Sequence, residues 1–260
     1  MKKIKKKMVS VCFYFQVHQP YRLRRYQVFD IGDSEEYFDD EKNRRIMEKV
    51  SKKCYIPTNN LMLELIEKFN GKFRISYSIT GTALEQFQLY VPEVLTSFQK
   101  LADTGCVEFL DETYYHSLAF LYSEKEFKEQ IRLHRKKIKE LFGQLPKVFR
   151  NTELVYNNKL AKLVENLGYK GVLAEGADHI LGWRSPNFVY KPIGCKKIKL
   201  LLKNYRLSDD IAFRFSERSW DQWPLTADKY AIWLSVTPGQ VINIYMDYDF
   251  LLFDYLSYLF

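Results

Sequence analysis

Two carboxylates in this chain each follow an apolar, β-prone segment, and together they could perform nucleophilic and acid–base chemistry. Glu153 comes directly after VFRNT, and Asp247 comes directly after VINIYM. When two such groups face one cleft, one can attack a carbon that carries a leaving oxygen, while the other protonates that oxygen and later deprotonates water. This pair of roles is the minimal equipment for retaining cleavage of a glycosidic bond, which needs carboxyl groups roughly 5–5.5 Å apart.

The neighbouring residues favour different roles for the two acids. Arg150, Asn151 and Thr152 precede Glu153 and offer hydrogen-bond donors that would keep this carboxylate ionised as a nucleophile. Asp247 ends a strongly apolar segment, where desolvation would raise its pKa towards that of a usable general acid. A single carboxylate at the end of a strand is usually a helix N-cap or a loop anchor, so the roles depend on the rest of the chain.

An apolar segment that ends in polar, chemically capable residues recurs seven times along the chain. These segments cover residues 9–17, 74–80, 107–110, 148–152, 171–175, 198–202 and 241–246. A strand that is buried on both faces presents such residues only at its end. The pattern therefore predicts parallel strands closed into a barrel, with the chemistry collected at one face.

Helical periodicity and capping residues fill the intervals between these strands. Helices are predicted over residues 41–53, 60–70, 83–104 with a break near Pro92, 123–142, 157–167, 209–215 and 226–235. Neither an internal repeat nor a flexible linker interrupts the alternation. The sequence therefore predicts a single barrel domain over residues 1–260.

The charge and cysteine content narrow the function classes. The formal net charge is +8, but five lysines stand in the opening MKKIKKK, and no basic stripe interleaved with stacking aromatics follows, which argues against nucleic-acid binding. No run approaches the roughly 18 consecutive apolar residues of a membrane span. Cys12, Cys54, Cys106 and Cys195 form no CxxC pair, so they predict buried thiols in a reducing compartment, the cytoplasm by default.

Aromatic residues are unusually abundant, with 19 Tyr, 19 Phe and four Trp. One interpretation is a bulky apolar core. The other is a cleft lined with aromatic rings, because the flat C–H faces of sugars stack on such side chains. The composition leaves both interpretations open.

An ordered set of motifs resembles glycoside hydrolase family 57, the family of α-amylase-like and 4-α-glucanotransferase-like enzymes. The motifs are HQPYRL, SITGTALEQ, ETYYHS, FRNTELVYNN, GVLAEGADHILGWRSPN, LLLKNYRLSDDIAFRFS and IYMDY, and the resemblance covers essentially all 260 residues. It implies an irregular, TIM-like (β/α)7 barrel that acts on α-1,4-glucans or maltooligosaccharides by retaining double displacement. On the matching positions, it implies that Glu153 is the nucleophile and Asp247 the acid/base.

The same resemblance implies a set of substrate contacts. His18 matches the residue that hydrogen-bonds the sugar undergoing cleavage, and Glu85 and His116 fall in motifs that line the same subsite. Further contacts are predicted in similar segments, at Trp183, Asp209 and Arg214. The residues alone favour another interpretation of His18, as a buried histidine that caps a turn before Pro20.

Other residues in these segments also have structural interpretations. Asp209 or Asp210 could cap a helix, and Arg214 could pair with Asp210 or Glu217. His134 is interpreted as a surface residue and His179 as a loop residue, and neither receives a role.

The end of the chain departs from the family pattern. After Tyr248 the family continues with a second carboxylate, an aromatic–glycine turn and a helical region that walls the cleft, whereas this chain continues as DFLLFDYLSYLF to Phe260. We therefore expect the barrel to lack that helical region, with its last strand uncovered and able to contact a partner chain or a second copy. A non-catalytic glucan-binding remnant, or one part of a split enzyme, is the alternative function.

A metal-dependent barrel enzyme, such as a polysaccharide deacetylase or a zinc mannosidase, is a third interpretation. Such sites need closely spaced His and Asp ligands. His18 is followed by Gln19 and Pro20 with no acid two residues on, and the chain contains no HxxxH. The sequence therefore predicts neither a metal site nor a cofactor.

Overall fold

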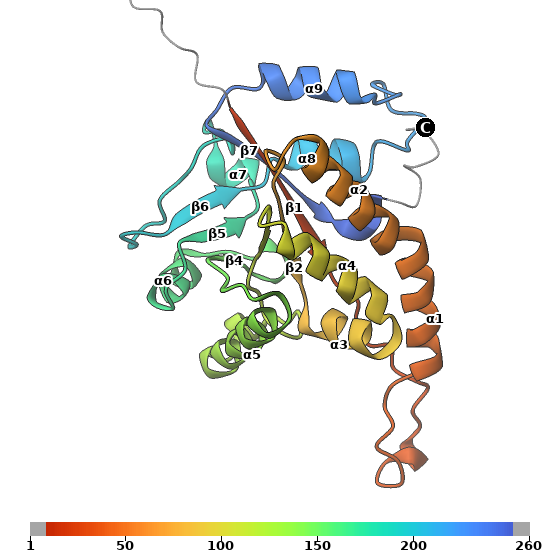
Figure 1. Ribbon diagram of the computed structural model, residues 1–260. Coiled ribbons are helices and arrows are strands. Elements are labelled where there is room, and N and C mark those ends of the chain that lie inside the picture. The colour runs from red at the N-terminus through yellow and green to blue at the C-terminus, as the bar shows by residue number, and fades with distance from the viewer. Residues whose placement is uncertain (1–8, 252–260) are drawn as a thin grey trace, which may run out of the picture.

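Seven parallel strands form the centre of the molecule in the computed structural model, which describes residues 9–251 (Figure 1). The strands are β1 (Ser10–Val17), β2 (Ile75–Ile79), β3 (Val107–Phe109), β4 (Val148–Arg150), β5 (Gly171–Ala174), β6 (Lys199–Leu202) and β7 (Val241–Asp247). All seven lie within one or two residues of the predicted segments. The strand predictions are therefore confirmed.

The strands close into a barrel through two short seams. Extended pairing gives one sheet in the order β3-β2-β1-β7 and a second in the order β4-β5-β6. Single parallel bridges join the two sheets, between Asp111 and Phe149 at one seam and between Lys203 and Asn243 at the other. The strand order around the barrel thus follows the chain, as the predicted (β/α)7 barrel requires.

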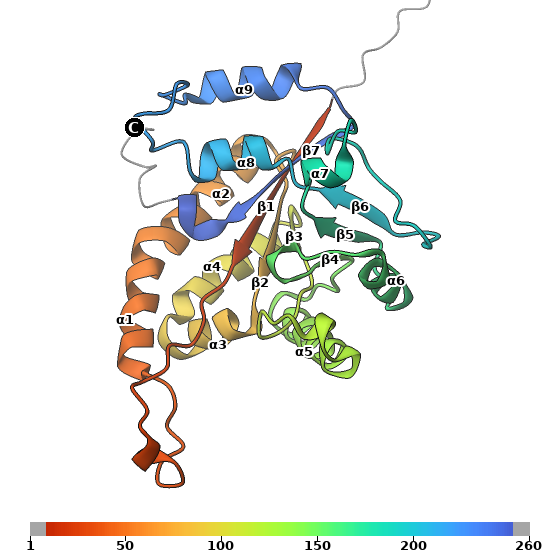
Figure 2. The same cartoon turned by 180° about the vertical axis from the view of Figure 1, so that it is seen from behind.

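Helices surround the strands, with α1 to α4 on one side and α5 and α6 on another (Figures 1 and 2). They are α1 (Asp40–Val50), α2 (Ile56–Lys68), α3 (Gly81–Tyr90), α4 (Pro92–Asp103), α5 (Glu124–Phe142), α6 (Asn158–Asn166), α7 (Asp178–Leu181), α8 (Tyr205–Ala212) and α9 (Ala227–Val236). The predicted break at Pro92 separates α3 from α4, and the side chain of Ser123 caps α5 by accepting from the amide of Glu126.

Three predicted helices differ from the structure in their limits. α1 continues into α2 through a π-helical turn, Ser51–Tyr55, so one bent helical stretch replaces two separate helices. α8 begins at Tyr205, four residues before its predicted start, because the side chain of Asn204 accepts from the amide of Leu207 and caps the helix there. None of the described helices has the length and apolarity that a membrane span requires.

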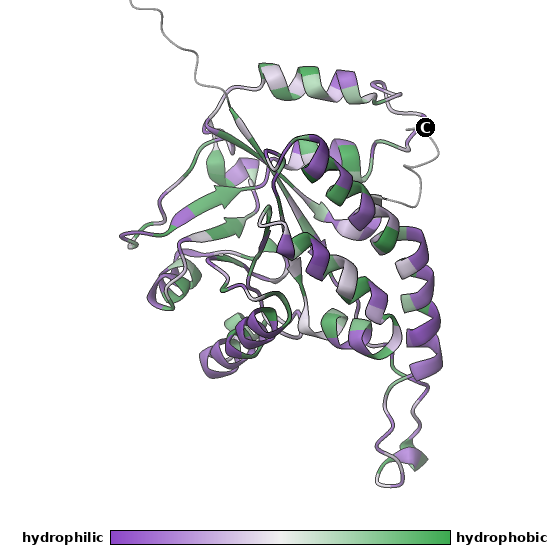
Figure 3. Cartoon of the chain, in the orientation of Figure 1, coloured by the Kyte–Doolittle hydropathy of each residue, from purple (hydrophilic) through white to green (hydrophobic). Residues whose placement is uncertain are grey.

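The apolar core consists of three layers. One packs the outer face of β1, β2, β3 and β7 against the surrounding helices, and a second packs β4, β5 and β6 against α5 and α6. The helices combine hydrophilic and hydrophobic residues (Figure 3), and their buried hydrophobic residues belong to these clusters. The third cluster lies inside the barrel and consists of Tyr14, Leu110, Leu154, Leu173 and Tyr245.

Many of the aromatic residues serve as core. Tyr55, Tyr77, Phe98 and Tyr248 are fully buried, and their rings contact one another in stacked, tilted and edge-on arrangements. The bulky-core interpretation therefore accounts for this part of the composition.

The prediction that the last strand is uncovered is wrong for the described residues. Ile242 and Ile244 of β7 are fully buried, and they share one cluster with Leu207 of α8 and Tyr230 of α9. The reason is that these two helices, which precede β7 in the chain, cover its apolar face. The predicted segment after Tyr248 lies mostly outside the described residues, and association through this edge stays a prediction.

Candidate active site

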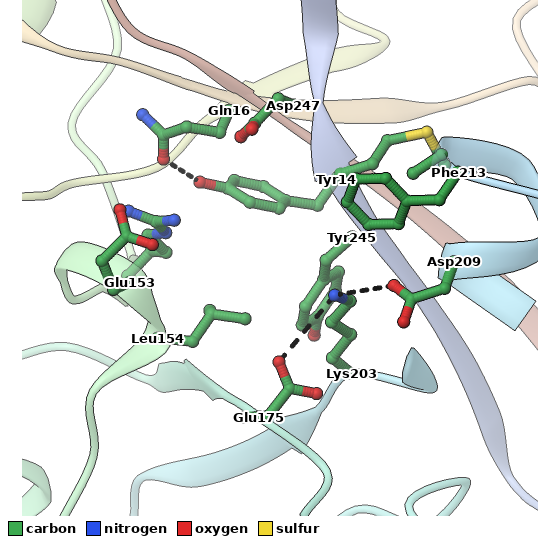
Figure 4. A pocket seen from close by; sticks show the side chains of 13 residues that line it. Tyr14, Gln16, Glu153, Leu154, Glu175, Lys203, Asp209, Phe213, Tyr245 and Asp247 are labelled. Atoms are coloured by element: carbon green, nitrogen blue, oxygen red, sulfur yellow. Dashed lines mark hydrogen bonds and ion pairs between the residues drawn. The ribbon is translucent and has the colours of Figure 1, made fainter. Parts of the chain in front are cut away.

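Both predicted acids line one pocket at the end of the barrel where the strands finish (Figure 4). Residues from β1, β4, β7, α8 and the segments that follow β4, β5 and β6 form its wall. They are Tyr14, Gln16, Arg150, Glu153, Leu154, Glu175, Lys203, Asp209, Ala212, Phe213, Tyr245, Met246 and Asp247. This is the face on which a parallel barrel collects its functional side chains.

Glu153 stands on a strained turn directly after β4. Its backbone φ is 53° and that of Leu154 is 54°, in the left-handed region that costs an L-residue roughly 1–2 kcal/mol. The amide side chain of Asn151 donates to the carbonyl of Val155 at 3.0 Å and holds the turn closed. Such strain persists only where the surroundings enforce it, and it concentrates at functional sites. The turn leaves the Glu153 side chain 71% exposed.

His116 connects Glu153 to a buried carboxylate. Its Nε2 lies 3.2 Å from Oε1 of Glu153, and its Nδ1 lies 3.2 Å from Oε2 of Glu112. His116 also has a left-handed backbone, with φ 54°. Its imidazole stacks on that of His18, with ring centroids 4.1 Å apart. The structure therefore brings His18 and His116, both predicted from the sequence, to the Glu153 side of the site.

Glu112 is the buried carboxylate that holds His116 in place. Its side chain is fully buried, and Gln16 donates to its Oε1 at 2.9 Å. Burial alone would raise the pKa of Glu112, but the hydrogen bond from His116 and the charges of His116 and Arg150 outweigh it and lower the pKa to about 2. His18 is shifted to a pKa of about 4, because burial disfavours the imidazolium and His116 adds repulsion.

Asp247, the last residue of β7, faces the same pocket (Figure 4). Desolvation by the surrounding walls raises its pKa, and the charge of Glu153 adds to that effect, while Arg150 opposes it. The raised pKa is the direction that the sequence predicted for this acid. A carboxyl group of this kind can retain a proton and donate it.

The wall opposite Glu153 carries a lysine between two acids. Nζ of Lys203 lies 3.4 Å from Oδ1 of Asp209 and 3.8 Å from Oε2 of Glu175 (Figure 4). Asp209 is thus a pocket residue, as predicted, and the side chain that caps α8 belongs to Asn204 instead.

Five predicted contacts are not among the residues that line this pocket: His18, His116, Glu85, Trp183 and Arg214. The carboxylate of Glu85 accepts hydrogen bonds from Tyr114 at 2.7 Å and Tyr21 at 3.4 Å. Arg214 pairs with Asp210 at 2.6 Å, the internal partner considered from the sequence. Trp183 follows α7 and is 95% exposed.

Sequence reasoning missed several residues that shape the site. Tyr14 and Gln16 alternate along β1, and Tyr245 and Asp247 alternate along β7, so a period of two places both pairs inside the barrel. That signal was present in the sequence.

The interpretation of His134 as a surface residue is wrong, because its imidazole is fully buried between Asp111 and the carbonyl of Ile79.

The buried ion pair of Glu112 predicts a dependence of stability on pH. The pKa of Glu112 is about 2 in the fold against 4.5 unperturbed, so its stabilising contribution is complete above pH 4.5 and is lost as pH falls towards 2. We expect the difference in unfolding free energy between wild type and Glu112→Gln to shrink by on the order of 3 kcal/mol over that range. Urea unfolding across the range measures it.

Glu108→Gln is the matched control for this experiment, since Glu108 lies on β3 with an exposed side chain. Its difference from wild type should stay nearly constant as the pH falls. A constant difference for Glu112→Gln would contradict the assignment.

The sequence of this chain is similar to that of a known protein family. The model of glycosyl hydrolase family 57 matches residues 12–257. The chain belongs to glycosyl hydrolase family 57. It is 54% identical over 243 residues to a candidate alpha-amylase of Methanocaldococcus jannaschii, covering 92% of this chain and 51% of that protein. The chain therefore spans about half the length of this curated family 57 relative.

Solved structures share the family 57 fold. The 4-alpha-glucanotransferase of Thermococcus litoralis superimposes with a TM-score of 0.70 at 18% identity, over 97% of this chain and 35% of that one. The branching enzyme of Pyrococcus horikoshii gives a TM-score of 0.63 at 13% identity, over 94% of this chain and 64% of that one. At these identities the likeness shows the (β/α)7 fold alone.

Proposed function

We propose that this protein is a retaining glycoside hydrolase or transglycosylase that acts on α-1,4-glucans. The observation that carries the proposal is that Glu153 and Asp247, which come from the two different sheets of the barrel, line one pocket. Desolvation raises the pKa of Asp247, which suits a proton donor, and the strained turn presents Glu153 to the same pocket.

The residues perform the reaction in two halves. First, the carboxylate of Glu153 attacks the anomeric carbon, the bond to the glycosidic oxygen breaks, and that oxygen takes the proton of Asp247. Then a water, or a hydroxyl of another sugar, gives its proton to Asp247 while its oxygen bonds to the anomeric carbon and Glu153 leaves as a carboxylate. Water gives hydrolysis, and a sugar hydroxyl gives glucan transfer.

Charge and size of the pocket support a neutral sugar as the substrate. The pocket has a volume of about 220 Å³, below the roughly 300 Å³ at which drug-sized ligand sites begin. It therefore admits about one ring of a chain at the reaction centre. It carries four acids and two bases, so its net charge disfavours anionic glycans. The four acids are Glu153, Glu175, Asp209 and Asp247, and the two bases are Arg150 and Lys203.

The proposal also covers the metal requirement of the reaction and the compartment in which it takes place. Within residues 9–251, no group of three or more His, Cys, Asp or Glu side chains could hold a metal ion, and we propose a mechanism without one. The four cysteines are free, which supports the cytoplasm as the place of action.

Products from maltoheptaose test the proposed reaction. We expect shorter maltooligosaccharides from hydrolysis, or shorter and longer ones together from transfer, resolved by chain length and unchanged by a chelator. Loss of activity in chelator would favour the metal-dependent alternative. Binding of maltoheptaose without turnover would favour the non-catalytic glucan-binding alternative.

The role of Asp247 has its own test. Asp247→Asn should lower turnover of maltoheptaose by about 10²–10⁴-fold, the usual contribution of a general acid. With an α-glucosyl fluoride, whose leaving group needs little protonation, the loss in the first half-reaction should be much smaller. Asp228→Asn, at an exposed position of α9, is the control. Equal losses with both substrates would contradict the acid role.

A further inference from the structure

Arg150 is buried in the pocket but has no role in the two steps of the proposed reaction. It is the last residue of β4, is 6% exposed, and lines the pocket together with both acids. Its amide donates to the carbonyl of Asp111 at 2.8 Å, which fixes its backbone at the seam between β3 and β4. The position of its guanidinium is thus set by the barrel itself.

The guanidinium of Arg150 has no polar partner within residues 9–251. Its Nε and Nη1 are enclosed by protein and make no hydrogen bond, and neither a hydrogen bond nor an ion pair joins it to a described carboxylate. The other cation of the pocket, Lys203, lies between two acids. A buried, unpaired charge destabilises the fold, by about 1–3 kcal/mol or more for a lost partner.

The charge of Arg150 reaches the titratable groups around it through space. It lowers the pKa of Asp247, of Glu112 and of Tyr14, and it also disfavours protonation of His18. Arginine keeps its proton at any physiological pH, and burial limits screening by solvent. Arg150 is thus a constant positive charge in the site.

The groups around Asp247 shift its pKa in opposite directions. Burial raises its pKa most, and Arg150 is the largest of the lowering causes. Glu153 raises it further, whereas His116 and Lys203 lower it. The other charged or titratable groups of the site are Tyr14, Glu175, Asp209 and Asp249.

We propose that Arg150 is a positioning residue whose fixed charge allows Asp247 to serve as acid in the first half-reaction and as base in the second. The inference rests on the proposed function. In the free enzyme, burial and the negative charge of Glu153 both favour the protonated form of Asp247. Once Glu153 is esterified by the sugar, its charge is gone while the charge of Arg150 remains, so the balance shifts towards the ionised form of Asp247, which can take a proton from water.

Arg150→Met and Arg150→Lys test this role against a merely structural one. In Arg150→Met, the basic limb of the pH profile of kcat/KM should move up by about one pH unit, because Asp247 keeps its proton to higher pH. The second half-reaction should slow by about 10-fold, so that the glycosyl-enzyme accumulates as a burst with an α-glucosyl fluoride. Arg150→Lys keeps the charge and should restore both properties in large part.

The outcomes separate this inference from the proposed function. If wild type turns over and folded Arg150→Met keeps its pH profile and shows no burst, the inference fails alone. If both variants lose activity equally with unchanged profiles, Arg150 is only a contact residue and the inference again fails. If wild type has no glucan activity, the proposed function fails, and a ¹³C NMR titration of Asp247 in wild type and Arg150→Met then decides whether Arg150 controls its proton.

Discussion

Replacing Glu153 with glutamine is expected to lower turnover of maltoheptaose by about 10⁴-fold or more. The amide has nearly the shape of the carboxylate but cannot attack the anomeric carbon, so the covalent intermediate cannot form. Because the side chain is 71% exposed, the substitution should leave the fold and the affinity for maltoheptaose close to those of wild type. Single-turnover kinetics and isothermal titration calorimetry measure the two quantities.

Two further variants make the nucleophile assignment sharp. Glu140→Gln changes an exposed glutamate of α5 and should keep full activity. In Glu153→Ala, azide can occupy the vacated position and attack the same face of an α-glucosyl fluoride, which gives a glycosyl azide of inverted configuration. Activity of Glu153→Gln within about 10-fold of wild type, or no azide product, would reject the assignment.

Replacing Asp111 with alanine is expected to destabilise the fold by about 3–5 kcal/mol, the usual result of removing one partner from a buried ionic network. Its Oδ1 pairs with Nδ1 of His134 at 2.6 Å, and its Oδ2 accepts from Tyr169 at 2.5 Å and from Arg135 at 3.3 Å. All three partners would lose their acceptor at once. The backbone of Asp111 also forms the seam with β4, so the damage falls where the barrel closes.

Urea unfolding and thermal melts measure this loss. For a chain of this size, 1 kcal/mol corresponds to roughly 2–4 °C in Tm, so the melting temperature should fall by about 10 °C. Asp103→Ala is the control, because Asp103 ends α4 with an exposed side chain. A change of less than about 1 kcal/mol in Asp111→Ala would show that the network is not a stabilising one.

The fold was predictable because its signals are local. Each strand is a short apolar run followed by a change to polar residues, and side chains such as Ser123 mark the starts of helices. The sequence predicted that the barrel closes but not which residues close it, because closure depends on two bridges between residues far apart in sequence. The predicted start of α8 was wrong because its cap, Asn204, comes only two residues after β6.

The site was predictable where a residue lies next to a strand. Glu153, Asp247, His18 and His116 lie at or beyond strand ends, and the structure places all four at one face of the barrel. The premise that polar residues occur only at strand ends was too strict. Gln16 lies within β1, because near the mouth of a barrel the inner face is itself a polar surface.

Residues on longer connections were harder to place. Trp183 belongs to a segment whose course depends on contacts that the sequence pattern does not encode. The pairing of Arg214 with Asp210 was one of the alternatives that the sequence left open. His134 lies on a helix face whose partner, Asp111, comes from another strand. Without that partner, a histidine among lysines and arginines looks exposed.

The two seams have a consequence for the proposed chemistry. Glu153 follows a strand of the three-stranded sheet, and Asp247 ends a strand of the four-stranded sheet. Each way around the barrel from one acid to the other therefore crosses one of the single bridges between the sheets. Any sliding of one sheet against the other would change the separation of nucleophile and proton donor directly, so transient opening at the seams, visible by amide hydrogen exchange, would limit how often the pair is aligned for reaction.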